Sequence, residues 1–189
     1  MTAIARAVTL LAAAALAICG AGGPVLAGPP SVVVSADPGG ASGAIDGQVD
    51  IDAPPAVVWR VLVDPGRTAE LMVGAKSCKV LSRDPAGHWD VREQISKGGL
   101  FPSVRSVIRS DYQPYALVRF HRIDGDIKLL EGEWRLTPLD GGARTRLEYR
   151  LRVTAPIAAP DALVRAALRR DTPTTLANVR DASQAAARP

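Results

Sequence analysis

The chain has 189 residues, a formal net charge of +4 and 47% hydrophobic residues. This length accommodates one domain or two small ones, and the composition excludes disordered, collagen-like and coiled-coil proteins. Two cysteines exclude a fold held together by several disulfides, and an aromatic content of 4% argues against a base-stacking nucleic-acid platform.

Residues 1–27 have the features of a secretory signal peptide. Arg6 provides a basic start, residues 8–18 form an apolar run, and Val25–Ala27 ends in compact residues suited to cleavage. The run is shorter than the about 20 residues needed to span a bilayer. We therefore expect export to the periplasm. A loose lipobox match ending at Cys19 leaves a lipoprotein as the alternative.

Residues 28–44 are rich in Gly, Pro, Ser and Ala, which predicts a flexible linker before a folded domain at 45–188. Cys78 is the only cysteine after the signal peptide, and it lies within an apolar alternation that favours a buried thiol. Arginine supplies most of the positive charge without forming one concentrated patch. We therefore expect no nucleic-acid partner.

The first predicted strand covers residues 45–52, where apolar and polar residues alternate. The prolines that follow end it, and Pro55 suits the first turn of a helix whose apolar residues recur between Val57 and Leu62. Short alternating segments bounded by turn residues then predict six more strands. They cover residues 77–82, 88–96, 103–112, 117–124, 127–137 and 145–154.

The last two strands are joined at Asp140-Gly141-Gly142, a strong hairpin signal. In the final strand apolar residues alternate with charged ones, which predicts one solvated and one covered face. A long helix with an apolar stripe follows from Asp161. Thr172-Pro173 either begins a second helix or kinks a single long one, and the sequence leaves both open.

These elements predict an α+β fold in which a curved seven-stranded antiparallel sheet wraps around a long C-terminal helix. Strands in hairpin succession pair antiparallel, and a sheet with one solvated face must bury the other. A single helix leaves room against a strongly curved sheet. We therefore expect a gap between them that binds an apolar ligand.

Residues 49–59, V-D-I-D-A-P-P-A-V-V-W, together with Gly132–Pro138 and the C-terminal helix, resemble the START-like helix-grip superfamily (SRPBCC). Within it, the chain is similar to the polyketide cyclase/dehydrase and lipid-transport members and to the coenzyme-Q-binding relatives. The resemblance covers residues 45 to about 180 and implies the helix-grip fold. The superfamily contains lipid carriers, quinone-binding proteins and aromatase/cyclases, so the resemblance implies a ligand cavity without naming its ligand.

Motifs for metal, cofactor or nucleophilic chemistry are missing from the sequence. His88 and His121 are the only histidines, and neither has metal-ligand spacing. The sequence has neither a nucleophile elbow nor a phosphate-binding glycine loop. We therefore expect no bound metal and no cofactor.

Glu93 is the one weak candidate for a catalytic residue. It shares strand parity with Trp89, Val91 and Ile95, and a carboxylate on an apolar inner face has a raised pKa. Such a group is suited to general-base catalysis of an enolisation. The alternative is an ion pair with an arginine.

The expected cavity residues are the apolar positions on one face of the strands and of the last helix. Ordinary core packing is the alternative for each. They are Val91, Val104, Ile108, Phe120, Trp134, Leu136, Leu147, Tyr149, Leu151, Leu168 and Leu176.

Two further features bear on the ligand. Trp134 and Tyr149 carry polar tips that need partners when buried, so either one could orient a ligand. Leu100 and Phe101 follow a glycine turn and predict an apolar portal that touches a membrane or a partner. The alternative is a hairpin end that folds onto the core.

The sequence therefore predicts a monomer that binds or transports a hydrophobic small molecule, such as a lipid or a quinone, without catalysis. It would contact a membrane transiently. The first alternative is a polyketide cyclase or dehydratase. The second is a protein interaction module with a filled core. The sequence leaves the identity of the ligand open.

Overall fold

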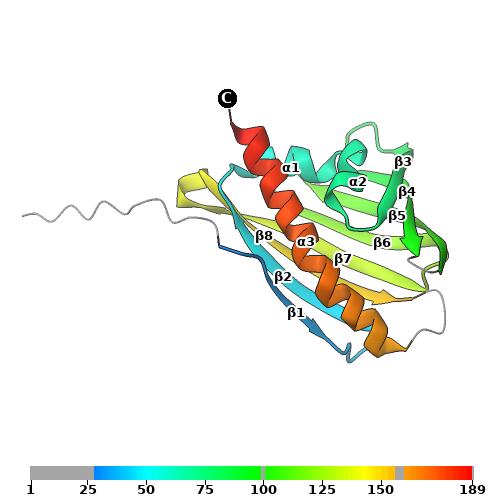
Figure 1. Ribbon diagram of the computed structural model, residues 1–189. Helices are drawn as coiled ribbons and strands as arrows, with labels where there is room; N and C mark the ends of the chain where they lie inside the picture. The colour runs from blue at the N-terminus through cyan, green and yellow to red at the C-terminus, as the bar shows by residue number, and fades with distance from the viewer. Residues whose placement is uncertain (1–27, 99–100, 156–159, 189) are drawn as a thin grey trace, which may run out of the picture.

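The computed structural model describes residues 28–98, 101–155 and 160–188. One open, curved antiparallel sheet of eight strands lies against a long C-terminal helix, α3 (Asp161–Ala187), which crosses it diagonally (Figure 1). We call the side of the sheet toward α3 the inner face and the opposite side the outer face. The helix-grip architecture expected from the sequence is confirmed, with one strand more than expected.

The strands lie in the order β1-β2-β8-β7-β6-β5-β4-β3, and all neighbouring strands are antiparallel. Consecutive strands are neighbours except where β2 pairs with β8. Their bounds are β1 (Ser31–Ser35), β2 (Gly43–Ile51), β3 (Ala75–Arg83), β4 (Trp89–Gly98), β5 (Phe101–Gln113), β6 (Leu117–Gly125), β7 (Leu129–Leu139) and β8 (Arg144–Thr154).

The additional strand, β1, lies in residues 28–44, where the prediction of a flexible linker was wrong. It pairs with β2 over its whole length. Beyond it, Asp37 accepts hydrogen bonds from Arg152, with 2.8 Å between Asp37 Oδ2 and Arg152 Nη2. The sequence prediction followed the abundant glycine and proline of this segment and overlooked Val32–Val34, three consecutive residues with high strand propensity.

Two short helices cover one end of the inner face. Helix α1 (Pro55–Val63) begins at Pro55, as expected. A 3-10 turn, η1 (Pro65–Arg67), leads into α2 (Thr68–Leu71). Helix α1 packs against α3, and together with the sheet they bury one apolar core. Its most buried members include Ile51, Val58, Leu71, Leu147, Leu176 and Val179.

Helix α3 is a single helix that continues through Pro173, so the two-helix alternative is wrong. All of its buried residues lie between Thr172 and Ser183, in its C-terminal part. The helix packs mainly on β2, β1, α1 and α2. The inner face of the middle strands is therefore left without tight helix packing. Of the helices described, none is both long and apolar enough to cross a bilayer.

The outer face carries a network of arginine–carboxylate pairs. Arg146 donates to Asp50 across β8 and β2, with 2.8 Å between Nε and Oδ1, and this contact lowers the pKa of Asp50. Arg152 Nη1 lies 2.6 Å from Glu131 Oε1. The alternating charges of β8 thus form the solvated face that was expected. Cys78, predicted to be buried, is only half-buried because β3 is an edge strand.

Candidate functional site

A cavity of about 330 Å³ lies between the inner face of the sheet and the helices α2 and α3. Strands β4 to β8 supply most of its wall, and Ala167, Leu168 and Thr172 of α3 lie on the opposite side. Its volume lies at the lower end of the range of about 300–1,000 Å³ for small-molecule sites. The cavity therefore suits one compact molecule.

Three aromatic rings on neighbouring strands form the floor of the cavity. Trp134 of β7 lies opposite Tyr149 of β8, with ring centroids 3.9 Å apart and planes inclined by 18°. Phe120 of β6 also stacks with Tyr149, across β7, with a centroid separation of 6.4 Å. These rings give a broad apolar surface against which a flat ring or a chain can pack.

Gly132 makes this arrangement of rings possible. It lies opposite Phe120 on the neighbouring strand. A Cβ atom at this position would lie only 2.7 Å from Phe120 Cζ and would also collide with the carbonyl oxygen of Arg150. The absence of a side chain at residue 132 is therefore needed for the Phe120 ring to lie over the sheet.

The Tyr149 hydroxyl is a polar group of this floor, in addition to the indole N–H of Trp134. Tyr149 lines the cavity, and burial raises its pKa far above the usual range for tyrosine. The phenol is therefore neutral. Its oxygen makes no hydrogen bond with any described side chain or backbone group. A neutral donor facing the cavity can bind an oxygen atom of a ligand.

The wall formed by β4 and β5 is polar. Arg92, Gln94 and Ser96 line the cavity from β4, and Ser106 and Ser110 line it from β5. The sequence predicted none of the five, because the only polar groups expected in the cavity were the tips of Trp134 and Tyr149. The sequence does contain a sign of this polar wall. The even-numbered residues from 90 to 96 are Asp, Arg, Gln and Ser, so this face of β4 had to lie either in solvent or along a polar cavity wall.

The predicted inward parity of β4 was therefore wrong by one residue. Val91 and Glu93 lie on the outer face, next to residues of β5. Glu93 accepts a hydrogen bond from Arg105 Nε at 2.6 Å, which is the ion pair that had been the alternative to catalysis. The guanidinium of Arg109 lies over the Trp89 ring, 4.5 Å from its centroid. Arginine side chains thus shield the apolar residues on the outer face of β4 from water, although these residues are not packed in the core.

The polar wall ends at a buried ion pair. Arg92 Nε donates to Asp90 Oδ2 at 2.8 Å, and the exposed fractions of the two side chains are 10% and 9%. Arg92 Nη2 also donates to the Tyr112 hydroxyl at 3.0 Å. Burial is the largest single influence on the pKa of Arg92 and lowers it, but the hydrogen bond to Asp90 and the charges of Tyr112, Asp90 and Cys78 together outweigh burial, so the pKa is raised. Asp90 Oδ1 is buried and has no partner.

The structure brings about half of the expected cavity residues together. Ile108, Phe120, Trp134, Tyr149, Leu151 and Leu168 line the cavity. Leu136, Leu147 and Leu176 are instead buried in the core, because they lie toward the end of the sheet that α1 covers. Val104 is half-buried and, like Val91, does not line the cavity. Leu100 and the side chain of Phe101 lie outside the described residues, so the portal stays a prediction.

The histidines lie away from the cavity. His88 Nδ1 lies 2.9 Å from Asp84 Oδ2 in a turn, and His121 is exposed on β6. Within the described ranges, no group of three or more His, Cys, Asp or Glu side chains is placed to hold a metal ion. Arg105 binds Asp124 as well as Glu93, and none of these three residues lines the cavity. Arg122 donates to the carbonyl of Gly125.

The sequence matches a known protein family, and the fold matches solved structures. The family model described as polyketide cyclase / dehydrase and lipid transport matches residues 51–180. None of the curated proteins matches significantly in sequence.

Among solved structures, a STAR-related lipid transfer protein from Xanthomonas axonopodis superimposes with a TM-score of 0.69 and 18% identity, covering 82% of this chain and 94% of that one. The Zhui aromatase/cyclase from Streptomyces sp. R1128 superimposes with a TM-score of 0.64 and 19% identity, covering 84% and 96%. Human STARD10 has a TM-score of 0.68 and 12% identity, covering 82% and 69%. At sequence identities below 20%, these similarities establish a shared fold and not a shared function.

Proposed function

The chain belongs to the polyketide cyclase/dehydrase and lipid-transport family, and on this basis we propose that it binds and carries one compact hydrophobic molecule in the cavity under α3. The cavity itself is the observation that supports this proposal most. An interaction module with a filled core would not leave about 330 Å³ between sheet and helix. An empty apolar cavity costs stability, and a ligand recovers part of that cost.

The composition of the wall indicates an amphiphile rather than a pure hydrocarbon. The floor of Phe120, Trp134 and Tyr149 favours a flat or chain-like apolar body. The Tyr149 hydroxyl offers one donor to it, and the serines of β5 offer further polar contacts on the opposite wall. The ligand we propose has an apolar face and carbonyl or hydroxyl oxygens along one edge, as a quinone does.

Carriage is favoured over a cyclase reaction because of the ionisable groups around the cavity. A general acid or base works best with a pKa near neutrality. Arg92 and Tyr112 both have raised pKa values, so neither exchanges protons readily at neutral pH. Asp171 also lines the cavity, but it is bound by Arg170 at 2.7 Å. Among the described residues, no histidine lines the cavity.

The opening of the cavity suits contact with a membrane of anionic lipids. Val73 is 43% exposed and lines the cavity, as does the exposed Ala167. We give the name basic rim to four exposed cations near this opening: Lys76, Lys97, Lys128 and Arg169. Lys97, Lys128 and Arg169 directly follow lining residues, and Lys76 comes three residues after Val73.

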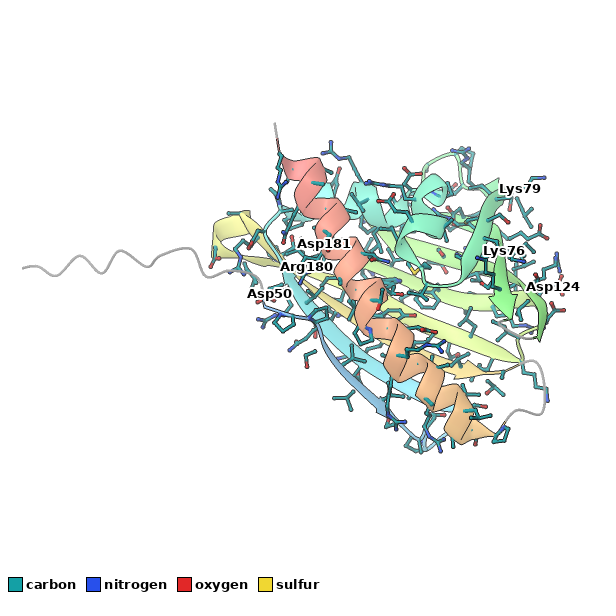
Figure 2. All side chains as sticks on the ribbon, viewed as in Figure 1. Asp50, Lys76, Lys79, Asp124, Arg180 and Asp181 are labelled. Atoms are coloured by element: carbon teal, nitrogen blue, oxygen red, sulfur yellow. The ribbon has the colours of Figure 1, made fainter. Side chains whose placement is uncertain are left out.

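The basic rim differs from the outer face in being without counter-charges. No ion pair joins its members to a described carboxylate, whereas the arginines of β8 are paired. Lys76 lies at the end of the molecule that carries Asp124, far from Asp50 and from the Arg180–Asp181 pair (Figure 2). A cation near an anionic bilayer contributes about 1 kcal/mol of attraction. We propose that ligand enters or leaves while this rim faces the lipid, after export of the mature chain.

Native mass spectrometry of protein purified from its own periplasm tests the proposal. We expect a second species with the mass of one bound molecule, which disappears after extraction with organic solvent. A single apo mass would count against carriage if no lipid or quinone fraction raised the melting temperature of the delipidated protein either.

A further inference from the structure

The open sheet has two edge strands, β1 and β3, and only one of them is protected against pairing with a further strand. Natural edge strands are usually protected by charged side chains and by irregularities in register. Strand β3 has both kinds of protection. Its register with β4 shifts twice, and it carries three exposed cations, Lys76, Lys79 and Arg83. An incoming strand would therefore meet an irregular and positively charged edge at β3.

Strand β1 has neither kind of protection. Its residues Ser31–Ser35 carry no charge, and they pair with β2 in unbroken register. Val33, at the centre of the strand, is 63% exposed. Among the described elements, none lies beyond β1 at this margin of the sheet (Figure 1). The edge formed by β1 therefore has the regular backbone and neutral side chains that another β-strand needs for pairing.

The free hydrogen-bonding groups of this edge belong to Val32 and Val34. The carbonyl oxygen of Ser31 lies 3.7 Å from the position that a Cβ atom would occupy on Gly47 of β2, so this carbonyl is directed toward β2. Successive residues of an antiparallel strand alternate between bonding to the partner strand and facing away from it. The N–H and C=O groups of Val32 and Val34 are therefore directed away from the sheet. In agreement, the oxygen of Val34 is reached by the guanidinium of Arg169, at 3.4 Å and in solvent.

The β1 strand of a second copy fits these free groups. A twofold axis perpendicular to the sheet pairs two β1 strands antiparallel about Val33, so that Val32 of each copy lies opposite Val34 of the other. Each such pair exchanges both of its N–H···O bonds. The two Val33 side chains then meet on the outer face as a non-hydrogen-bonded pair, the kind in which side chains lie closest.

Length and charge also favour a second copy. Pro30 has no N–H to donate at the next outward position, and beyond β1 the chain turns at Asp37, whose carbonyl accepts from Gly40. The free edge is therefore as long as β1 itself. Pairing about a twofold axis sets each central residue against its own copy, and like charges placed opposite each other are destabilising. Strand β1 avoids this cost because it is neutral, whereas twofold pairing of β3 about Lys79 would place two lysines together.

We propose that the protein forms a weak homodimer through β1, in which the two sheets join into one continuous antiparallel sheet. A twofold axis perpendicular to the sheet leaves both α3 helices and both cavities on the same side. The dimer does not depend on what the cavity carries. So short an interface buries less than the about 1,200 Å² of stable complexes, so we expect a dissociation constant on the order of 100 μM. The monomer expected from the sequence is the alternative.

Sedimentation velocity of protein purified from the periplasm tests the proposal, over concentrations from about 10 μM to about 1 mM. We expect the dimer fraction of the unaltered protein to rise across this range. Val33→Lys places two like charges opposite each other and should weaken dimerisation about tenfold or more. Its melting temperature should stay nearly unchanged, because Val33 is exposed. Leu81→Lys makes the same change at an exposed position of β3 and should leave the dimer intact.

A charge-reversed variant tests the register of the pairing. Val33→Glu alone should weaken dimerisation as Val33→Lys does. A mixture of the two variants should form a heterodimer more readily than either variant forms a homodimer, because lysine and glutamate then lie opposite each other. This rescue also shows that both variants are folded. The proposal is overturned if the unaltered protein is monomeric over the whole range, if Val33→Lys and Leu81→Lys affect the dimer equally, or if mixing the Val33 variants restores no association.

Discussion

Trp134 and Tyr149 lie opposite each other on β7 and β8, with their rings nearly parallel and 3.9 Å apart. This pair fixes the orientation of the Tyr149 ring, so its hydroxyl is held in the cavity rather than free to turn toward solvent. A donor held in place before binding loses little entropy when the ligand arrives. The pair therefore combines an apolar surface with a fixed hydrogen-bond donor.

Replacement of Tyr149 by Phe removes this donor and keeps the ring. We expect Tyr149→Phe to weaken binding of duroquinone, a quinone probe with two carbonyl acceptors, by about two- to tenfold, since one hydrogen bond contributes about 0.5–1.5 kcal/mol. Binding of durene, which has the same methylated ring and no oxygen, should not change. Tyr115→Phe is the control, because Tyr115 is 55% exposed. Equal losses for duroquinone and durene would show that the hydroxyl does not contact the ligand.

Filling the cavity should block it without unfolding the protein. Leu151 lines the cavity and is 7% exposed, so Leu151→Trp directs an indole into the space that a ligand would occupy. We expect loss of probe binding and a stability cost of at most about 1–3 kcal/mol, the usual range for overpacking. Ile123→Trp, at an exposed position of β6, is the matched control. Unchanged binding by a folded Leu151→Trp protein would place the ligand elsewhere.

The outer-face ion pairs predict how stability depends on pH. Arg146 lowers the pKa of Asp50, and Arg105 lowers the pKa of Asp124, in each case from an ordinary value of 3.8. A carboxylate whose pKa is lower in the folded state contributes stability above its unfolded pKa and loses it as pH falls. The melting temperature should therefore be nearly flat from neutral pH to about pH 5 and should fall below about pH 4.

High salt is the control for this pH dependence. In 1 M NaCl the Debye length falls to about 3 Å, so exposed ion pairs contribute less and the fall at low pH should become shallower. A melting temperature that rises on acidification would contradict the assignment of these carboxylates.

The basic rim predicts a charge-dependent contact with anionic bilayers. We expect the triple variant Lys76→Glu, Lys97→Glu and Lys128→Glu to bind vesicles containing phosphatidylglycerol at least tenfold more weakly than the unaltered protein. The control reverses three exposed charges that flank no lining residue of the cavity: Lys79→Glu, Arg83→Glu and Arg188→Glu. Co-sedimentation with the vesicles measures both. Equal losses in the two variants would mean that net charge alone, and not the rim, governs the contact.

The sequence predicted the fold well wherever one face of an element was clearly apolar. In β8, Leu147, Tyr149 and Leu151 alternate with charged residues, and all three lie on the inner face as expected. Strand β4 carries polar residues on its inner face and apolar residues under arginine side chains on its outer face. Alternation of hydrophobicity assigns such a strand to the wrong side, because it assumes that the enclosed face is the apolar one.

The site was harder to predict than the fold for a related reason. Several apolar residues on the same faces as the cavity residues are packed in the core instead, because they lie at the end of the sheet that α1 covers. They are Leu136, Leu147 and Leu176. The Asp90–Arg92 pair depends on contacts with the carbonyl of Val63 and with Tyr112, residues distant in sequence. The signal peptide and the Leu100–Phe101 portal lie outside the described residues and stay predictions.

The Trp134 indole resonance is the most direct test of whether the cavity under α3 carries a ligand. Delipidated protein, ¹⁵N-labelled at its indoles, is titrated with fractions of a lipid and quinone extract from the source organism. At least one fraction should shift the Trp134 resonance and raise the melting temperature, while the resonance of Trp89 on the outer face should not move. If every fraction leaves Trp134 and the melting temperature unchanged, the cavity under α3 is not a carrier site and the proposed function is wrong.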